Sequence, residues 1–172
     1  MQGICKNFGA VQANNNVDLN LSEGDILGLL GENGAGKTTL MNILFGTYQA
    51  DEGKIMIQGR HITIHSTADA LGFGIGMVHQ HFHLVHQHTV LENLLVGEPG
   101  RMGRLDFFGA RRRLLEIGEQ FGLTLNPDAR VSELTIGEQQ RLEIIKALFG
   151  DSKILILDEP TAVLTPNEIG RA

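Results

Sequence analysis

The chain has 172 residues, of which 42% are hydrophobic and 20% are charged, and its formal net charge is −6. This composition excludes a disordered or collagen-like chain, the length is sufficient for one domain with a buried core, and the acidic balance argues against nucleic-acid binding by charge attraction. The longest apolar runs, residues 26–30 and 154–157, have the length of strands and fall well short of the roughly 18 residues of a membrane span.

Predicted strands and helices alternate along the chain, which is typical of an α/β fold. The predicted strands, in chain order, span residues 17–21, 26–30, 53–59, 75–79 and 153–158. A glycine-rich loop over residues 31–36 follows the second of these strands, which is expected to be buried, and leads into an amphipathic helix. Leu40, Ile43 and Leu44 lie on one face of that helix, so we expect them to pack against a core.

Several helix starts carry the same signal, a serine or threonine with an acidic residue three positions later. In this capping box the two side chains satisfy backbone N–H groups that have no helical partner. The four pairs are Ser66/Asp69, Thr89/Glu92, Thr135/Glu138 and Thr165/Glu168. Residues 89–149 are predicted to be mostly helical, with Leu114, Ile117 and Phe121 on one face. Residues 97–109 are rich in glycine and are expected to form a flexible loop.

Residues 31–38 read Gly-Glu-Asn-Gly-Ala-Gly-Lys-Thr and match the phosphate-binding pattern G-x-x-x-x-G-K-[ST]. Glycines let the backbone N–H groups of such a loop turn towards an anion, and the following helix N-terminus adds partial positive charge. Lys37 can reach the β- and γ-phosphates of a nucleotide, and the Thr38 hydroxyl can bind Mg²⁺. The alternative is a glycine-rich turn with an incidental lysine. The loop residues expected to hold the nucleotide are Gly31, Asn33, Gly34, Ala35, Gly36, Lys37, Thr38 and Thr39.

The last predicted strand supplies the second half of a nucleoside triphosphate site. Asp158 and Glu159 directly follow the apolar run Ile154–Leu157. Asp158 at the strand end can hold Mg²⁺ through water, and Glu159 can accept a proton from an attacking water. The alternative is a strand that ends in two solvated acidic residues. The phosphate-binding loop earlier in the chain favours the nucleotide site.

The order of these motifs resembles that of the ATP-binding-cassette (ABC) ATPases. Between the two half-sites lie Gln80, after a predicted strand, and Leu134-Thr-Ile-Gly-Glu-Gln139, at a predicted helix start. Residues 78–93 and 134–168 are similar to the ATPase subunit of simple-sugar and nucleoside importers. The resemblance covers essentially the whole chain and implies an α/β P-loop NTPase core of ABC-ATPase type with an α-helical insert.

The resemblance also implies how the chain is organised. Residues 1–88 and 150–172 correspond to the P-loop core, and residues 89–149 to the helical subdomain, of a single, C-terminally incomplete ABC ATPase domain. In the family a switch histidine that contacts the γ-phosphate comes well past the position of Glu159, yet the 13 residues after Glu159 contain no histidine. We therefore expect the chain to be a fragment or truncated form, about two-thirds of the first ATPase half of a tandem chain.

Further residues receive roles from the resemblance. Phe8 matches the aromatic that stacks on adenine, with a core aromatic as the alternative. Gln80 matches the loop glutamine that senses Mg²⁺ and the attacking water and that leads into the surface facing the membrane partner; a polar loop residue is the alternative. Thr135, Gly137 and Glu138 match the signature that acts in trans on the γ-phosphate held by the opposite ATPase half. An ordinary capped helix is the alternative for this segment.

The implied activity is ATP binding and hydrolysis that powers an importer for nucleosides or simple sugars. Lys37, Gln80 and Glu159 are the implied catalytic residues, and Thr38, Gln80 and Asp158 the implied Mg²⁺ ligands. The implied partners are a second ATPase half, in tandem or as a dimer, and transmembrane permease subunits, which alone would bring the chain to the cytoplasmic face of the membrane. No direct contact with nucleic acid is expected. Two alternatives stay open: a truncated, non-hydrolysing nucleotide-binding remnant, and a soluble ABC ATPase that acts on nucleic acid or ribosomes.

The signature departs from the usual Leu-Ser-Gly-Gly-Gln. Its last four positions are Thr135, Ile136, Gly137 and Glu138. Ile136 adds bulk where a backbone approaches a phosphate, and Glu138 places an anion where an amide is usual. We interpret the variant as a subclass feature, because similar variants occur in the first half of tandem sugar-importer ATPases.

Two basic or metal-binding features have more than one interpretation. Five histidines fall between His79 and His88, and zinc binding would require His79 and His83 on a helix at i, i+4 spacing. A polar loop that faces a partner is the better interpretation. The run Arg111-Arg-Arg113 has the charge to bind phosphate, but successive residues spread around a helix and Arg112 precedes Glu116 by four residues. A solvated helix face is therefore the better interpretation.

Overall fold

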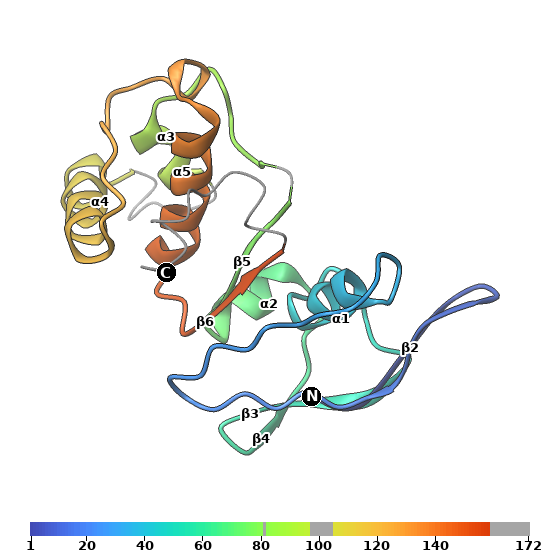
Figure 1. The fold of residues 1–172 in the computed structure, drawn as a ribbon. Helices are drawn as coiled ribbons and strands as arrows, with labels where there is room; N and C mark the ends of the chain where they lie inside the picture. Colours follow the sequence, from blue (N-terminus) through green and yellow to red (C-terminus); the bar gives the residue numbers. More distant parts are fainter. Residues whose placement is uncertain (81, 97–104, 159–172) are drawn as a thin grey trace. The chain divides into compact units, whose positions relative to one another are not determined.

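The structure is a computed structural model that describes residues 1–80, 82–96 and 105–158. The chain divides into two compact units, and the boundary falls after Ile75. Strands dominate the first unit and helices the second, as the labels in Figure 1 show. Along the chain, helices nevertheless separate the strands: α1 lies between β2 and β3, α2 between β4 and β5, and α3 to α5 between β5 and β6, which confirms the predicted α/β class.

The first unit is built on a four-stranded antiparallel sheet with the order β2-β1-β3-β4. Its strands are β1 (Gln2–Phe8), β2 (Val11–Val17), β3 (Glu52–Ile57) and β4 (Arg60–Ile62). β1 is central, because β2 pairs with one edge and β3 with the other. The pairing of β1 with β2 sets Lys6 opposite Asn14, and Asn14 is buried. The hairpin of β1 and β2 thus contains a buried polar side chain.

Two helices complete the first unit, α1 (Lys37–Leu44) and α2 (Thr67–Gly72). The predicted apolar face of α1 is confirmed, since all three of its members are buried: Leu40, Ile43 and Leu44. α1 begins at the last two residues of the phosphate-binding motif, so the motif lies at a helix N-terminus as expected.

Two strands predicted in the first unit are wrong. Residues 26–30 form no strand, and Ile26 and Leu30 are 91% and 94% exposed rather than buried. A strand is stabilised by a neighbour that pairs with its backbone N–H and C=O groups, and no strand in the described part of the chain pairs with this segment. The strand predicted over 17–21 lies earlier in the chain, because the residues that pair with β1 run from Val11 to Val17.

In its described residues the second unit packs three helices around an apolar core. These are α3 (Val90–Leu95), α4 (Phe107–Phe121) and α5 (Ile136–Phe149), and a 3₁₀ turn, η1 (Val131–Glu133), precedes α5. The three helices lie close together in Figure 1. Their shared core consists of Leu84, Val90, Leu94, Leu114, Ile117, Val131, Leu142 and Ile145. The predicted helical character of this region is confirmed for the described residues, although Phe121 on the predicted α4 face is 45% exposed.

A two-stranded sheet of β5 (Ile75–Val78) and β6 (Ile154–Leu157) adjoins these helices in sequence. All four residues of β5 are buried. The apolar run of β6 is typical of a buried strand, but β6 is only partly buried, because Leu155 and Leu157 are 37% and 38% exposed. Among the described residues β6 pairs with β5 alone, so much of its surface has no neighbouring strand to cover it.

The capping signals are confirmed where the structure describes them. Thr89 and Thr135 form complete capping boxes with the glutamate three residues on. Ser66 accepts a hydrogen bond from the backbone N–H of Asp69 at 3.2 Å. The pair at Thr165 lies outside the described residues, as does the segment 97–104 of the predicted flexible loop, whose end instead begins α4.

Candidate functional site

The phosphate-binding loop has the backbone geometry of an anion cradle. Gly34 and Gly36 both have φ of 85°, which is the left-handed conformation that glycine adopts without strain. A Cβ on Gly36 would stand 2.1 Å from the carbonyl oxygen of Ala13, so a side chain has no room at that position. Gly36 caps α1 without a side-chain hydrogen bond, and the first turn of α1 contains no acidic residue. A phosphate at this helix start would therefore meet partial positive charge and no acidic side chain from the first turn.

Lys37 folds back over the same loop. Its Nζ donates to the carbonyl oxygens of Gly31 and Glu32, at 2.7 and 2.8 Å. Both bonds are exposed, so phosphate oxygens can replace the two carbonyls at little desolvation cost. Among the described residues no carboxylate forms an ion pair with this ammonium, and Thr38, the next residue, is exposed. If Lys37 were an incidental lysine, its two hydrogen bonds to the carbonyl oxygens of the loop would have no explanation.

Asn14 supports the loop and is a residue that the sequence analysis missed. Its Nδ2 donates to the carbonyl oxygen of Gly36 at 3.2 Å, and the side chain is only 5% exposed. Its Oδ1 is buried and has no hydrogen-bond partner among the described residues. Burying an amide group with an unsatisfied oxygen destabilises the fold. In return, the Asn14 amide fixes Gly36, the residue at which the loop becomes α1. The only sequence signal is an asparagine on the inward-facing register of a strand.

Replacing Asn14 by leucine is expected to weaken Mg-ATP binding about fivefold to tenfold, the effect of losing one hydrogen bond that orders the loop. Asn15→Leu is the matched control, because Asn15 is the next residue of β2 and is exposed. Equilibrium binding of a fluorescent ATP analogue measures both. Equal affinities for the two variants would show that Asn14 has no part in nucleotide binding.

Phe8 is not a core aromatic. It is 43% exposed, at the end of β1, and its ring packs edge-on against Tyr48 at a centroid distance of 5.3 Å. Lys6 Nζ lies 5.5 Å from the centre of the Phe8 ring. The core-aromatic alternative is therefore wrong, whereas stacking on adenine stays a prediction. Tyr48, itself 40% exposed, is a second aromatic at this position that the sequence analysis did not single out.

The second unit brings together the ends of β5 and β6, where two predicted ligands lie. Asp158 directly follows β6, and its backbone N–H donates to the carbonyl oxygen of Val78 at 3.1 Å. Gln80 is exposed two residues after Val78, and Asp158 is half-buried. His79 lies between Val78 and Gln80 in the sequence. Burial lowers the pKa of His79, the nearby His83 lowers it further, and the Asp158 carboxylate opposes both effects. Glu159, the predicted base, lies outside the described residues.

The signature segment occupies the start of α5. The Thr135 hydroxyl accepts from the Glu138 N–H at 3.3 Å, and the Glu138 carboxylate accepts from the Thr135 N–H at 2.8 Å. The hydrogen bonds from the Thr135 hydroxyl and N–H hold the pKa of Glu138 below its usual range, so the carboxylate is charged at neutral pH. Ile136 is 60% exposed, and a Cβ on Gly137 would meet no atom within 4 Å. The segment is therefore a capped helix start that is accessible to another protein. The Glu138 carboxylate already accepts hydrogen bonds from the N–H and hydroxyl groups of Thr135.

Among the described histidines of the run, His79 and His83 form a close pair. The rings of His79 and His83 are 4.7 Å apart in an edge-to-face arrangement. Within residues 1–80, 82–96 and 105–158, no three His, Cys, Asp or Glu side chains are grouped so as to hold a metal ion. The hydroxyl, amide and carboxylate oxygens of Thr38, Gln80 and Asp158 are the donor types that Mg²⁺ prefers, and on that ground these residues fit the ion.

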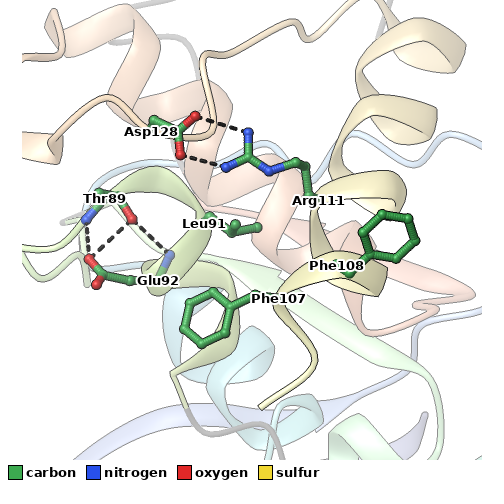
Figure 2. Close-up of a pocket in the computed structure, with 7 residues that line it drawn as sticks. All are labelled: Thr89, Leu91, Glu92, Phe107, Phe108, Arg111 and Asp128. Atoms are coloured by element: carbon green, nitrogen blue, oxygen red, sulfur yellow. Dashed lines mark hydrogen bonds and ion pairs between the residues drawn. The ribbon is translucent and has the colours of Figure 1, made fainter.

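A shallow surface hollow of about 420 Å³ lies on the helical part of the second unit, away from these residues in sequence. Figure 2 shows Phe107 and Phe108 at its edge and two pairs of polar groups in its wall. Arg111 binds the Asp128 carboxylate through both terminal nitrogens, at 2.9 and 2.5 Å, and Thr89 is engaged by Glu92. Its arginine is thus already neutralised within the chain.

The prediction that the arginine run is a solvated face is confirmed. All three members are paired with carboxylates on the surface: Arg111 with Asp128, Arg112 with Glu116, and Arg113 with Asp151. The Arg112–Glu116 pair has the predicted i, i+4 spacing, with 3.6 Å between Nε and Oε1. Each of the three arginines is thus already paired with a carboxylate of the chain.

Comparison with known proteins decides the family. A family model described as "ABC transporter" matches residues 14–162. The chain belongs to the ABC transporter ATP-binding family. Among relatives of this ABC ATPase, the guanosine import ATP-binding protein NupO of Bacillus subtilis is 49% identical over 170 residues. The nucleoside import ATP-binding protein NupA of Lactococcus lactis is also 49% identical over 170 residues. In both cases the match covers 98% of this chain but only 33% or 34% of the relative, so the ABC ATPase chain spans about a third of their length.

Solved structures agree with this assignment. The ATP-binding cassette MJ1267 in its ADP conformation superposes with a TM-score of 0.83 at 30% identity, over 99% of this chain and 71% of that one. The dimeric cassette MJ0796 gives 0.81 at 27% identity, over 99% and 77%. The ABC ATPase therefore has the P-loop NTPase fold that the motif order implied. Its described helices include none with the length and apolar character to cross a membrane.

Proposed function

We propose that the chain binds and hydrolyses ATP as part of the motor of an importer. The observation that carries the proposal is the loop at 31–38, with an uncapped α1 start and Lys37 Nζ held over the loop by two exposed carbonyls. Such a loop offers backbone donors and one mobile cation to the β- and γ-phosphates. Phe8, on the same unit, offers an exposed ring to the base.

The remaining chemistry falls to residues near the ends of β5 and β6. Gln80 and Asp158 from these strand ends, together with Thr38 from the start of α1, are the proposed holders of Mg²⁺, which when bound offsets charge on the phosphates. Gln80 would orient a water, and Glu159 would accept its proton. The Asp158 N–H bond to Val78 supports this proposal, because it sets the β6 end beside the segment that leads to Gln80.

We propose that the signature residues Thr135, Gly137 and Glu138 act on ATP held by a second ATPase half. The exposed start of α5 supports this role, and so does the neighbour MJ0796, which is described as a dimeric cassette. When the two halves close around ATP, the segment after Gln80 would transmit this movement to transmembrane permease subunits. In this arrangement the permease holds the chain at the cytoplasmic face of the membrane.

Nucleosides or simple sugars are the proposed cargo. The support comes from relatives: NupO is a guanosine import protein, NupA is a nucleoside import protein, and a protein of Chromobacterium violaceum that is 46% identical is a ribose import protein. The test is reconstitution of the protein with its permease and binding protein in vesicles, with uptake of guanosine and of ribose measured with and without ATP. ATP-dependent uptake of either supports the proposal. Absence of uptake, with RNA or ribosomes co-purifying, would favour the nucleic-acid alternative.

Replacing Glu138 by glutamine is expected to raise the rate of ATP hydrolysis about fivefold in the reconstituted protein. Its carboxylate is charged at neutral pH, and one like charge about 4 Å from a phosphate costs roughly 1 kcal/mol in water. Glutamine keeps the capping geometry, because its amide oxygen can accept the same bonds. Glu133→Gln, an equal change of charge on the neighbouring η1 turn, is the control. Equal rates for both variants would contradict a trans role for this position.

A further inference from the structure

The segment His83–Val85, a few residues past Gln80, is fastened by side chains of two different helices. The His83 N–H donates to Glu143 Oε1 at 2.5 Å, and Lys146 Nζ donates to the His83 carbonyl oxygen at 3.1 Å. The Val85 N–H donates to Asn93 Oδ1 at 2.8 Å, and Asn93 Nδ2 donates to the Val85 carbonyl oxygen at 3.0 Å. Each of these two residues is thus bound at both its N–H and its C=O, as it would be in a sheet.

Two of the three side chains that make these bonds, Asn93 and Glu143, are buried. Asn93 is 0% exposed and Glu143 is 5% exposed, although Glu143 carries a titratable carboxyl. Buried polar and charged groups are destabilising unless they are hydrogen-bonded. An apolar side chain at the buried face of α5 would have a lower free energy of burial. Leu84, between the two fastened residues, is buried in the core shared by α3, α4 and α5. The segment therefore cannot shift without moving or breaking these contacts.

Glu143 and Lys146 lie on the helix that begins at the signature. α5 runs from Ile136 to Phe149, so Glu143 is about two turns from the Thr135 cap. A hydrogen-bonded helix of this length moves as a rigid rod. His83 follows Gln80 by three residues in the sequence. When His83 is displaced, Glu143 therefore transmits the displacement to the end of α5 that presents Thr135.

We propose that Glu143 is a positioning residue that couples the segment after Gln80 to the signature helix, with Lys146 completing the contact on the same helix and Asn93 fixing the segment to α3. A partner that presses on residues 83–85 would in this way set where the signature residues stand. The inference rests on the proposed function, because it assigns a coupling role within the same ATPase.

The test is the ratio of solute-stimulated to basal ATP hydrolysis in vesicles that hold the protein, its permease and its binding protein. The solutes are guanosine and ribose, and the larger stimulation is used. Glu143→Ala is expected to lower the ratio at least fivefold, while basal hydrolysis and ATP affinity stay within twofold of the unmodified protein. Glu143→Gln is expected to restore most of the ratio, because its amide oxygen can accept the His83 N–H. Glu119→Ala, an exposed glutamate on α4, is the matched control.

An unchanged ratio in Glu143→Ala overturns the inference, and so does a loss that Glu143→Gln fails to restore. If Glu143→Ala does not fold, Lys146→Met decides, because methionine has no N–H donor and the change removes the exposed bond to the His83 carbonyl. A lowered ratio in Lys146→Met then supports the inference and an unchanged ratio overturns it. An unmodified protein that no solute stimulates would defeat the proposed function and this inference together, whereas a stimulated protein with an unaffected Glu143→Ala variant defeats the inference alone.

Discussion

Replacing Lys37 by alanine is expected to weaken Mg-ATP binding about 100-fold or more. In the structure the Lys37 ammonium is held over the loop by the carbonyl oxygens of Gly31 and Glu32. Phosphate oxygens would take those positions, and two charge-assisted hydrogen bonds contribute roughly 3 kcal/mol together, which is about two orders of magnitude in affinity. Equilibrium binding of a fluorescent ATP analogue, with and without Mg²⁺, measures the effect.

Lys54→Ala is the matched control for this experiment, because Lys54 is an exposed lysine on β3 of the same unit. It removes the same charge without touching the loop, and its affinity should stay within about twofold. The circular-dichroism melting curves of both variants exclude unfolding as the cause. If Lys37→Ala binds ATP as tightly as Lys54→Ala does, the loop is a glycine-rich turn with an incidental lysine.

Features that depend on a few consecutive residues could be predicted from the sequence. The cap at Thr135 requires only a glutamate three positions on, and the structure shows both of its hydrogen bonds. The apolar face of α1 follows from helical spacing, and its three members are buried. The phosphate-binding loop belongs to the same class, because its glycines, its lysine and the helix start lie within eight residues.

Features that depend on residues distant in sequence could not be predicted in this way. The run 26–30 is apolar enough for a buried strand, yet burial requires a pairing strand, and no strand in the described part of the chain provides one. The same reason leaves β6 partly exposed. Asn14 contacts Gly36 across 22 residues, and Glu143 contacts His83 across 60, so neither has a local signal. Polar residues at core positions were the available hint, and only the structure shows which groups they bind.

Replacing Glu159 by glutamine is expected to abolish hydrolysis at the site that contains it while leaving ATP binding intact. A general base contributes about a hundredfold or more to such a step, and glutamine cannot accept the proton. The protein is incubated with Mg-ATP and its permease, free nucleotide is removed, and the retained nucleotide is extracted and identified. The unmodified protein should retain mainly ADP, and Glu159→Gln should retain ATP.

This readout separates the motor from the non-hydrolysing remnant, which total ATPase activity would not do if a second ATPase half also turns over. A remnant binds ATP through the loop at 31–38 but has no base to lose, so the unmodified protein and the variant would both retain ATP. Glu23→Gln, an exposed glutamate in the first unit, controls for the change of charge. The expected contrast between retained ADP and retained ATP requires both a competent phosphate loop and Glu159 beside the water. Retained ATP in every variant would instead assign the nucleotide a structural role in this chain.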